Sequence, residues 1–144
     1  MQIPLSIQES HADMRQWRQS LHSQPETAYE EYRTAAFIVE QLRNFGFSPK
    51  TGIAETGVVA SLKSGSSSRS IALRADMDAL HIEERTGLPY SSKNPGKMHA
   101  CGHDGHSAML LGAAKYLAEH RNFDGTVHFI FQPAEEGRAG AKSM

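Results

Sequence analysis

The order of predicted elements in this chain favours an α/β sandwich with functional groups at the ends of its strands. Helical and strand-like patterns alternate along the sequence, and the segments richest in histidine, cysteine and carboxylates follow strands or open a helix. The chain has 144 residues, of which 39% are hydrophobic, and this is enough for one ordinary core. No internal repeat or linker divides it, so we expect one domain.

Three segments have the apolar periodicity of helices. Residues 7–22 carry apolar side chains on a roughly helical repeat, with polar residues between them. Residues 29–45 form a second and stronger pattern, and Gly46 stands where a helix C-terminus favours a left-handed residue. A third pattern runs from about residue 105 to residue 120, with Asp104 as its candidate N-cap.

Three short apolar runs are typical of strands, and one long segment has no periodicity. Residues 58–62 and 71–75 flank a serine-rich turn at 64–68, so we expect them to form a hairpin. Residues 126–131 are typical of a largely buried strand. Residues 81–100 contain several glycines and prolines, which predicts a long loop of the kind that is often functional.

Charge, cysteine content and hydropathy exclude several classes of protein. With 15 basic and 16 acidic residues the net charge is -1, so no long-range field attracts nucleic acid or an anionic membrane. The single cysteine cannot form an intramolecular disulfide, and no basic segment leads into a long apolar one at the start of the sequence. The most apolar stretch, 108–114, is shorter than the roughly 18 residues of a membrane span. We therefore expect a cytoplasmic protein with neither nucleic acid nor membrane as partner.

The segment 98–106 is a candidate metal site, because four of its nine residues are histidine or cysteine. Cys101 and His103 stand two apart in a glycine-containing loop, where both side chains can converge on one cation. Thiolate and imidazole favour zinc or late first-row metals over magnesium or calcium. The positive end of the helix near Gly105 is expected to lower the pKa of Cys101. The alternative is a small buried cysteine among ordinary loop histidines.

Two carboxylate pairs also follow predicted strands. Glu135 and Glu136 would point to opposite sides of an extended segment, so that one can bind a metal while the other faces a bound water. Asp76 and Asp78 would share one side, either as direct ligands or as groups that orient a ligating imidazole. The alternatives are a solvated glutamate pair and aspartates that only turn the chain.

Four motifs, in order, make the chain resemble the amidohydrolase branch of the co-catalytic metallopeptidases. This group holds hippurate hydrolase, N-acyl-amino-acid amidohydrolases and the plant indoleacetyl-amino-acid hydrolases. The motifs are Leu21–Glu26 with Glu31 and Thr34 beyond it, Leu73–Leu80, His99–His106, and Gln132–Gly137. They cover almost the whole chain, so the resemblance is highly specific.

The resemblance implies a three-layer α/β/α sandwich with a mixed sheet and a centre of two divalent transition-metal ions. The ions would be manganese, zinc, cobalt or nickel. Carried over by position, Cys101, His103 and Glu136 are metal ligands and Glu135 is the general base. Asp78 resembles the aspartate that supports the metal site in related branches. The implied substrate is a small N-acyl amino acid or a similar amino-acid conjugate.

The chain departs from the family pattern in two positions and in length. Gln24 stands where a second histidine is common, and His81 where a proline is usual. Family members continue past Met144 with further metal histidines and a lid or dimerisation domain. Residues 1–144 are therefore expected to be the N-terminal part of a metal-dependent catalytic domain. A homodimer is one assembly that the resemblance allows.

Two other functions fit parts of the pattern. One is a catalytically inactive fragment that keeps at most a partial metal site, because the downstream histidines are missing. The other is a thiol hydrolase with Cys101 as nucleophile, but His103 is too close in sequence to serve as its base. A zinc deaminase is disfavoured, since its signature needs more than one cysteine.

Overall fold

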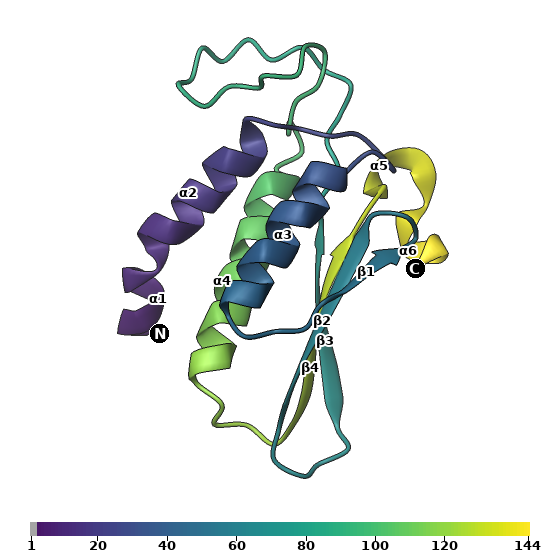
Figure 1. Cartoon of the computed structure of the whole chain (residues 1–144). Helices are drawn as coiled ribbons and strands as arrows, with labels where there is room; N and C mark the ends of the chain where they lie inside the picture. The colour runs from purple at the N-terminus through teal and green to yellow at the C-terminus, as the bar shows by residue number, and fades with distance from the viewer. Residues whose placement is uncertain (1–2) are drawn as a thin grey trace.

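The computed structural model describes residues 3–144 and contains a mixed four-stranded sheet (Figure 1). The strands are β1 (Lys50–Ile53), β2 (Gly57–Ser64), β3 (Ser70–Asp76) and β4 (Gly125–Gln132). Their order is β1-β2-β4-β3, with β3 parallel to β4 and the other neighbours antiparallel. The predicted α/β class with a mixed sheet is confirmed.

The expected hairpin between β2 and β3 is wrong, because β4 lies between these two strands. Val59 of β2 is opposite Ile130, and Leu73 of β3 is opposite Phe129. β4 is the most apolar strand and gains most from a neighbour on each side. The β3-helix-β4 connection gives it a parallel neighbour in the usual βαβ manner. Strand β1 was not predicted, since its short sequence has no apolar alternation.

The serine-rich turn between β2 and β3 is fixed by the chain that precedes β4. Asp124 Oδ1 accepts the backbone N–H groups of Ser66 and Ser67, both at 2.8 Å. Gly65 has a φ of +69°, and a Cβ there would lie 2.2 Å from the same carboxylate oxygen. The turn therefore ties the β2-β3 connection to the start of β4.

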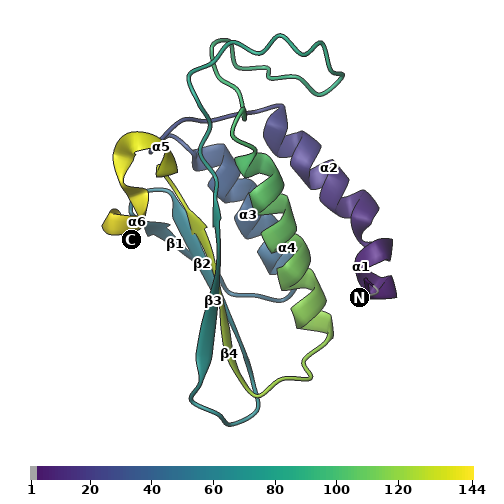
Figure 2. The same cartoon turned by 180° about the vertical axis from the view of Figure 1, so that it is seen from behind.

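Three long helices, α2 (His11–His22), α3 (Tyr32–Asn44) and α4 (His103–Glu119), cover one face of the sheet (Figures 1 and 2). The described residues also form three short helices, α1 (Leu5–Glu9), α5 (Glu135–Arg138) and α6 (Gly140–Ser143). The helix expected over 7–22 is divided at Ser10 into α1 and α2. The Ser10 hydroxyl and backbone N–H both donate to the Ser6 carbonyl oxygen, at 2.9 and 3.2 Å. The helix expected over 29–45 is α3.

Helix α4 begins two residues earlier than expected. Its N-cap is Gly102 in the left-handed conformation (φ 89°), and Asp104 lies inside the first turn instead of capping it. The glycine adopts this conformation at little steric cost. His103 is consequently the first helical residue, and its position is set by the helix.

The core lies between the sheet and these helices. Alternate residues of β4 point into it, and they pack with buried residues of α3 and α4. Its largest fully buried apolar side chains are Phe129, Phe131, Ile38, Leu42, Met77, Leu111 and Val58. The other sheet face carries exposed residues such as Ser61 and Arg74. Within residues 3–144 the three long helices make one layer (Figures 1 and 2), so a second layer of long helices, as in a three-layer sandwich, stays an expectation.

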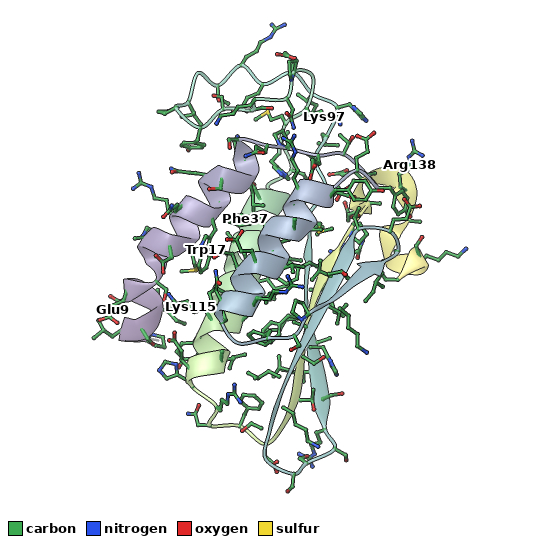
Figure 3. All side chains as sticks on the ribbon, in the orientation of Figure 1. Glu9, Trp17, Phe37, Lys97, Lys115 and Arg138 are labelled. Carbon is green, nitrogen blue, oxygen red and sulfur yellow. The ribbon has the colours of Figure 1, made fainter. Side chains whose placement is uncertain are left out.

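The packing of α2 against α4 is completed by side chains that Figure 3 labels. Trp17 of α2 is buried, and Lys115 Nζ of α4 lies 6.0 Å from the centre of its ring. The same ammonium forms a 2.7 Å ion pair with Asp13. Across the described residues 3–144, no helix is both long and apolar enough to pass through a membrane.

The predicted loop over 81–100 is confirmed, and it brings the motifs together. It rises above the N-terminal end of α4 at the top of Figure 1. Its base is closed by a bridge between Leu80 and Met98, with two N–H···O bonds of 3.0 Å. The ends of β3 and β4 and the start of α4 therefore lie at one end of the molecule.

Candidate metal centre

Cys101, His103 and Glu136 come together where β4 ends and α4 begins. One ligand atom from each lies within 4.8 Å of the ligand atoms of the other two. His103 is buried, Glu136 is partly buried and Cys101 is exposed. A thiol, an imidazole and a carboxylate that converge in this way fit a divalent transition-metal ion. The three ligands proposed from sequence are thus neighbours in space.

Asp78 holds two of these residues in place. Its carboxylate is within 3.2 Å of His103 Nδ1 through Oδ1 and accepts the Glu136 backbone N–H at 2.8 Å through Oδ2. Its backbone oxygen also lies 2.9 Å from His103 Nδ1. Burial raises the pKa of Asp78, but the hydrogen bonds from His103 and from the Glu136 backbone outweigh it, so the pKa lies below its ordinary value. Asp78 is therefore ionised and orients the imidazole.

The other nitrogen of His103 faces a group of acidic oxygens. His103 Nε2 lies 3.6 Å from Asp76 Oδ1, 3.8 Å from Glu136 Oε1 and 4.0 Å from Glu135 Oε2. Burial lowers the pKa of His103, but the carboxylates of Asp78 and Asp76 raise it above its ordinary value. Acidic oxygens gathered around a nitrogen at distances too long for good hydrogen bonds make an environment that a cation would fill.

The expected lowering of the Cys101 pKa is wrong for the metal-free protein. The hydrogen bond of the thiol to Glu136 raises the pKa of Cys101 most, followed by partial burial and by the charges of Glu136, Glu135 and Asp76. These carboxylates outweigh the partial positive charge at the N-terminus of α4. The alternative of a small buried cysteine is also wrong, because Cys101 is exposed.

A second group of ligand-type residues shares His103 with the first. Asp76, His103 and His106 also have ligand atoms within 4.8 Å of one another. Asp76 Oδ1 lies 2.7 Å from His106 Nδ1, and Oδ2 accepts the Arg74 guanidinium at 2.9 Å. The His103 and His106 rings stack, with centres 5.5 Å apart. His106 was missing from the ligands expected from sequence, although its i, i+3 spacing from His103 places both side chains on one helix face.

The expectation that Glu135 and Glu136 lie in an extended segment is wrong. Ala134 has left-handed dihedral angles (φ 53°, ψ 43°), so the chain turns sharply before the pair. Both carboxylates consequently approach His103 Nε2 and do not point to opposite sides. The Glu135 side chain is 41% exposed, which leaves it accessible to a water molecule beside the three candidate ligands.

Buried polar residues behind the centre fix the start of α4. Asp104 Oδ2 accepts the Arg18 Nε–H at 3.1 Å and lies 2.8 Å from His22 Nδ1. His22 Nε2 reaches Glu84 of the long loop at 3.2 Å. Burial lowers the pKa of His99 to about 4, so this ring is neutral. The motif Leu21–Glu26 thus supports the motif His99–His106 through the contact between His22 and Asp104. Sequence spacing does not reveal this contact.

This arrangement is that of a metallohydrolase-type α/β domain, with a thiol, an imidazole and carboxylates gathered at strand ends. The chain belongs to the family described as Peptidase family M20/M25/M40, which matches residues 72–144, half of its length.

Relatives and solved structures agree with this assignment. The chain is 52% identical over 127 residues to the hippurate hydrolase of Campylobacter jejuni, covering 88% of this chain and 33% of that protein. It is 45% identical over 136 residues to the N-acyl-L-amino acid amidohydrolase of Geobacillus stearothermophilus, covering 94% and 37%. A dinuclear metal-binding M20 peptidase of Bacillus subtilis has a TM-score of 0.90 and 42% identity, with 94% of this chain and 39% of that one covered. The chain spans about a third of the length of the curated relatives it matches.

Proposed function

We propose that this chain supplies metal ligands and a general base to an amidohydrolase that cleaves the amide bond of N-acyl amino acids or related conjugates. The observation that carries the proposal is the convergence of Cys101, His103 and Glu136, with Glu135 beside them. The printed names of the relatives support the substrate class, since they include a hippurate hydrolase and an N-acyl-L-amino acid amidohydrolase.

The proposed cofactor is a pair of divalent transition-metal ions: manganese, zinc, cobalt or nickel. Cys101, His103 and Glu136 would hold metal from this chain, and the soft thiolate favours these ions over magnesium. When bound, such ions polarise the scissile carbonyl and lower the pKa of a bound water towards about 7. The description of the related Bacillus subtilis protein as dinuclear supports a count of two.

Glu135 is the proposed general base. Its carboxylate is partly exposed and lies 4.0 Å from His103 Nε2, next to the ligands but free to accept a proton from the attacking water. The protonated acid then donates that proton to the nitrogen of the leaving amino acid. Asp78 orients His103 and fixes the backbone of Glu136 while this proton moves. The reaction is expected in the cytoplasm, where a single cysteine stays reduced.

Metal content of the purified 144-residue protein tests the proposal. We expect transition metal to co-purify, and we expect a Cys101→Ala, Glu136→Ala double variant to lose it, as measured by plasma mass spectrometry. A Cys101-retaining control, Asp13→Asn on the surface of α2, should keep the metal. Hydrolysis of N-benzoylglycine and N-acetyl amino acids with added manganese or zinc then tests the reaction. Equal metal in the double variant would contradict the assigned ligands.

A further inference from the structure

The turn that carries Glu135 and Glu136 is held by a buried glutamate from the other end of the chain. We propose that Glu31 is a positioning residue of the metal centre: its carboxylate fixes the left-handed turn at Ala134 and so places both glutamates beside His103. This inference rests on the proposed function and deepens it, because it names a residue that acts on the centre through the backbone.

Glu31 joins three segments that are far apart in sequence. Its side chain is fully buried, immediately before α3. Oε1 accepts the Ala134 backbone N–H at 2.8 Å, and Oε2 accepts the Thr56 hydroxyl at 2.6 Å. Thr56 and Ala134 are themselves buried. Both carboxylate oxygens are thus satisfied inside the protein, and one of these bonds goes to the backbone of the turn.

Ala134 needs such a partner for two reasons. A left-handed conformation is unfavourable for a residue with a Cβ, so the surrounding contacts must impose it. Its N–H is also buried, and a buried N–H without an acceptor is costly. Glu31 supplies the acceptor before Glu135, and Asp78 accepts the N–H of Glu136 after it. Two buried carboxylates therefore hold the turn on either side of the proposed base.

The side chain of the second glutamate of the same motif has only a local role. Glu26 accepts the backbone N–H groups of Arg33 and Thr34 at 3.2 and 2.8 Å, and the Thr34 hydroxyl at 3.0 Å. It therefore caps α3 and does not reach the centre. The contrast is useful, because Glu26 offers a matched control with the same charge and a comparable number of hydrogen bonds.

Neighbours of Glu31 strengthen its hold on the same segment. The Tyr29 hydroxyl donates to the Arg138 carbonyl oxygen at 3.0 Å, four residues beyond Ala134. On the side of β3, the Ala79 N–H donates to the Glu26 carbonyl oxygen at 2.8 Å. The short connection between α2 and α3 thus contacts both strand-end segments that carry the carboxylates. Of these contacts, that of Glu31 is made to the residue that directly precedes the proposed base, Glu135, in the sequence.

Amide hydrogen exchange of the ¹⁵N-labelled, metal-free chain tests the positioning directly. The Ala134 N–H should be protected in the parent chain and should exchange faster in Glu31→Ala. Glu31→Gln should keep the protection, because its amide oxygen can accept from Ala134 while its NH2 group donates to Thr56. Glu26→Ala should leave the Ala134 N–H protected. Unchanged protection in Glu31→Ala would overturn the proposal.

Cobalt titration supplies the second readout, through the thiolate-to-cobalt absorption of Cys101. We expect Glu31→Ala to weaken cobalt binding about 10- to 100-fold, as for removal of other groups behind metal ligands, and Glu31→Gln to restore it. Equal affinity in a folded Glu31→Ala would overturn the proposal. If the parent chain binds no cobalt while Glu31→Ala loses exchange protection, the proposed function fails and the positioning role of Glu31 stands.

A further variant keeps the test decisive if Glu31→Ala does not fold. Thr56→Val removes one of the two hydrogen bonds to the same carboxylate and keeps the side-chain volume. Faster exchange at Ala134 in Thr56→Val supports the role of Glu31, because the freed carboxylate would hold the turn less firmly. Unchanged protection both in Thr56→Val and in a folded Glu31→Asp, whose side chain is one methylene too short to keep both hydrogen bonds, overturns it.

Discussion

At the scale of single residues, carboxylates position most of the groups that surround the candidate metal centre. Asp78 orients His103 and the Glu136 backbone, Asp76 holds His106, and Glu31 holds Ala134. Each of these carboxylates is buried. Burying a charge costs free energy unless hydrogen bonds replace its hydration. Here backbone N–H groups, imidazoles, the Thr56 hydroxyl and the Arg74 guanidinium do so.

Replacement of Asp78 by asparagine should weaken metal binding. One amide oxygen cannot serve both His103 and the Glu136 N–H, so we expect an affinity loss of about 10- to 100-fold. Isothermal titration with zinc measures it, and Asp124→Asn, which alters only the distant β2-β3 turn, is the control. An unchanged zinc affinity in a folded Asp78→Asn would count against the orienting role.

Replacement of Glu135 by glutamine should separate metal binding from catalysis. The side chain lies beside the ligands without being one of the convergent three, so the metal content should stay. Amide hydrolysis should fall by about 10²- to 10⁴-fold, the usual contribution of a general base. Glu136→Gln, in contrast, should lose metal as well. Turnover retained in the Glu135 variant would contradict the assignment of Glu135 as the general base.

The buried Glu31 also predicts a dependence of stability on pH. Burial raises the pKa of this carboxyl above its ordinary value, although hydrogen bonds from Thr56 and Ala134 partly oppose the shift. The folded state then binds more protons than the unfolded state just above pH 4.5, so Glu31 contributes less stability as the pH rises through that range. Glu31→Gln cannot titrate.

Urea unfolding at pH 4 and pH 7 measures this effect. The free energy of unfolding of Glu31→Gln, relative to the parent chain, should be higher at pH 7 than at pH 4. Glu26→Gln removes a partly buried carboxylate of the same motif and serves as the comparison. A difference that is the same at both pH values would show that Glu31 has an ordinary pKa in the folded state.

At the scale of elements, two left-handed positions place the proposed ligands at one end of the sheet. Gly102 turns the chain into α4 between Cys101 and His103, and Ala134 turns it after β4, before the glutamates. The parallel pairing of β3 with β4 places the end of β3 at the same edge. Local turns therefore set the fine geometry, and the topology of the sheet sets the location.

Alanine at Gly102 should cost stability and metal affinity together. Its φ of +89° is unfavourable for any residue with a Cβ, by roughly 1–2 kcal/mol, although nothing lies within 4 Å of the position of that Cβ. Relaxation of the turn would also move Cys101 relative to His103. Gly105→Ala is the matched control. Gly105 lies inside α4, and nothing is within 4 Å of the position its Cβ would take, so this substitution should stabilise the helix by roughly 0.5–1 kcal/mol. Thermal unfolding and zinc titration of both variants decide between these outcomes.

At the scale of the whole molecule, the sequence predicts local elements and the neighbourhood of the site, but not its long-range contacts. The periodicity of α3 and the apolar run of β4 are visible because each depends on its own residues. The pairing of β4 between β2 and β3 is not visible, since partner choice is non-local. The reach of Glu31 to Ala134, across more than a hundred residues, is hidden for the same reason.

The open edge of β3 predicts self-association of the 144-residue chain. Among the described residues β3 pairs on one side only. Ile71 of β3 is 61% exposed, and Met109 of α4, which lines a surface hollow together with residues 73–76 of β3, is 62% exposed. An unpaired edge strand flanked by apolar side chains invites another chain to pair with it. Sedimentation velocity should therefore show an average mass that rises with concentration, and Ile71→Lys should return it to the monomer value. Ile82→Lys, the same change at an exposed residue of the long loop, should not. A monomer at every concentration in the parent chain would mean that the twist and the polar residues of β3 already protect this edge.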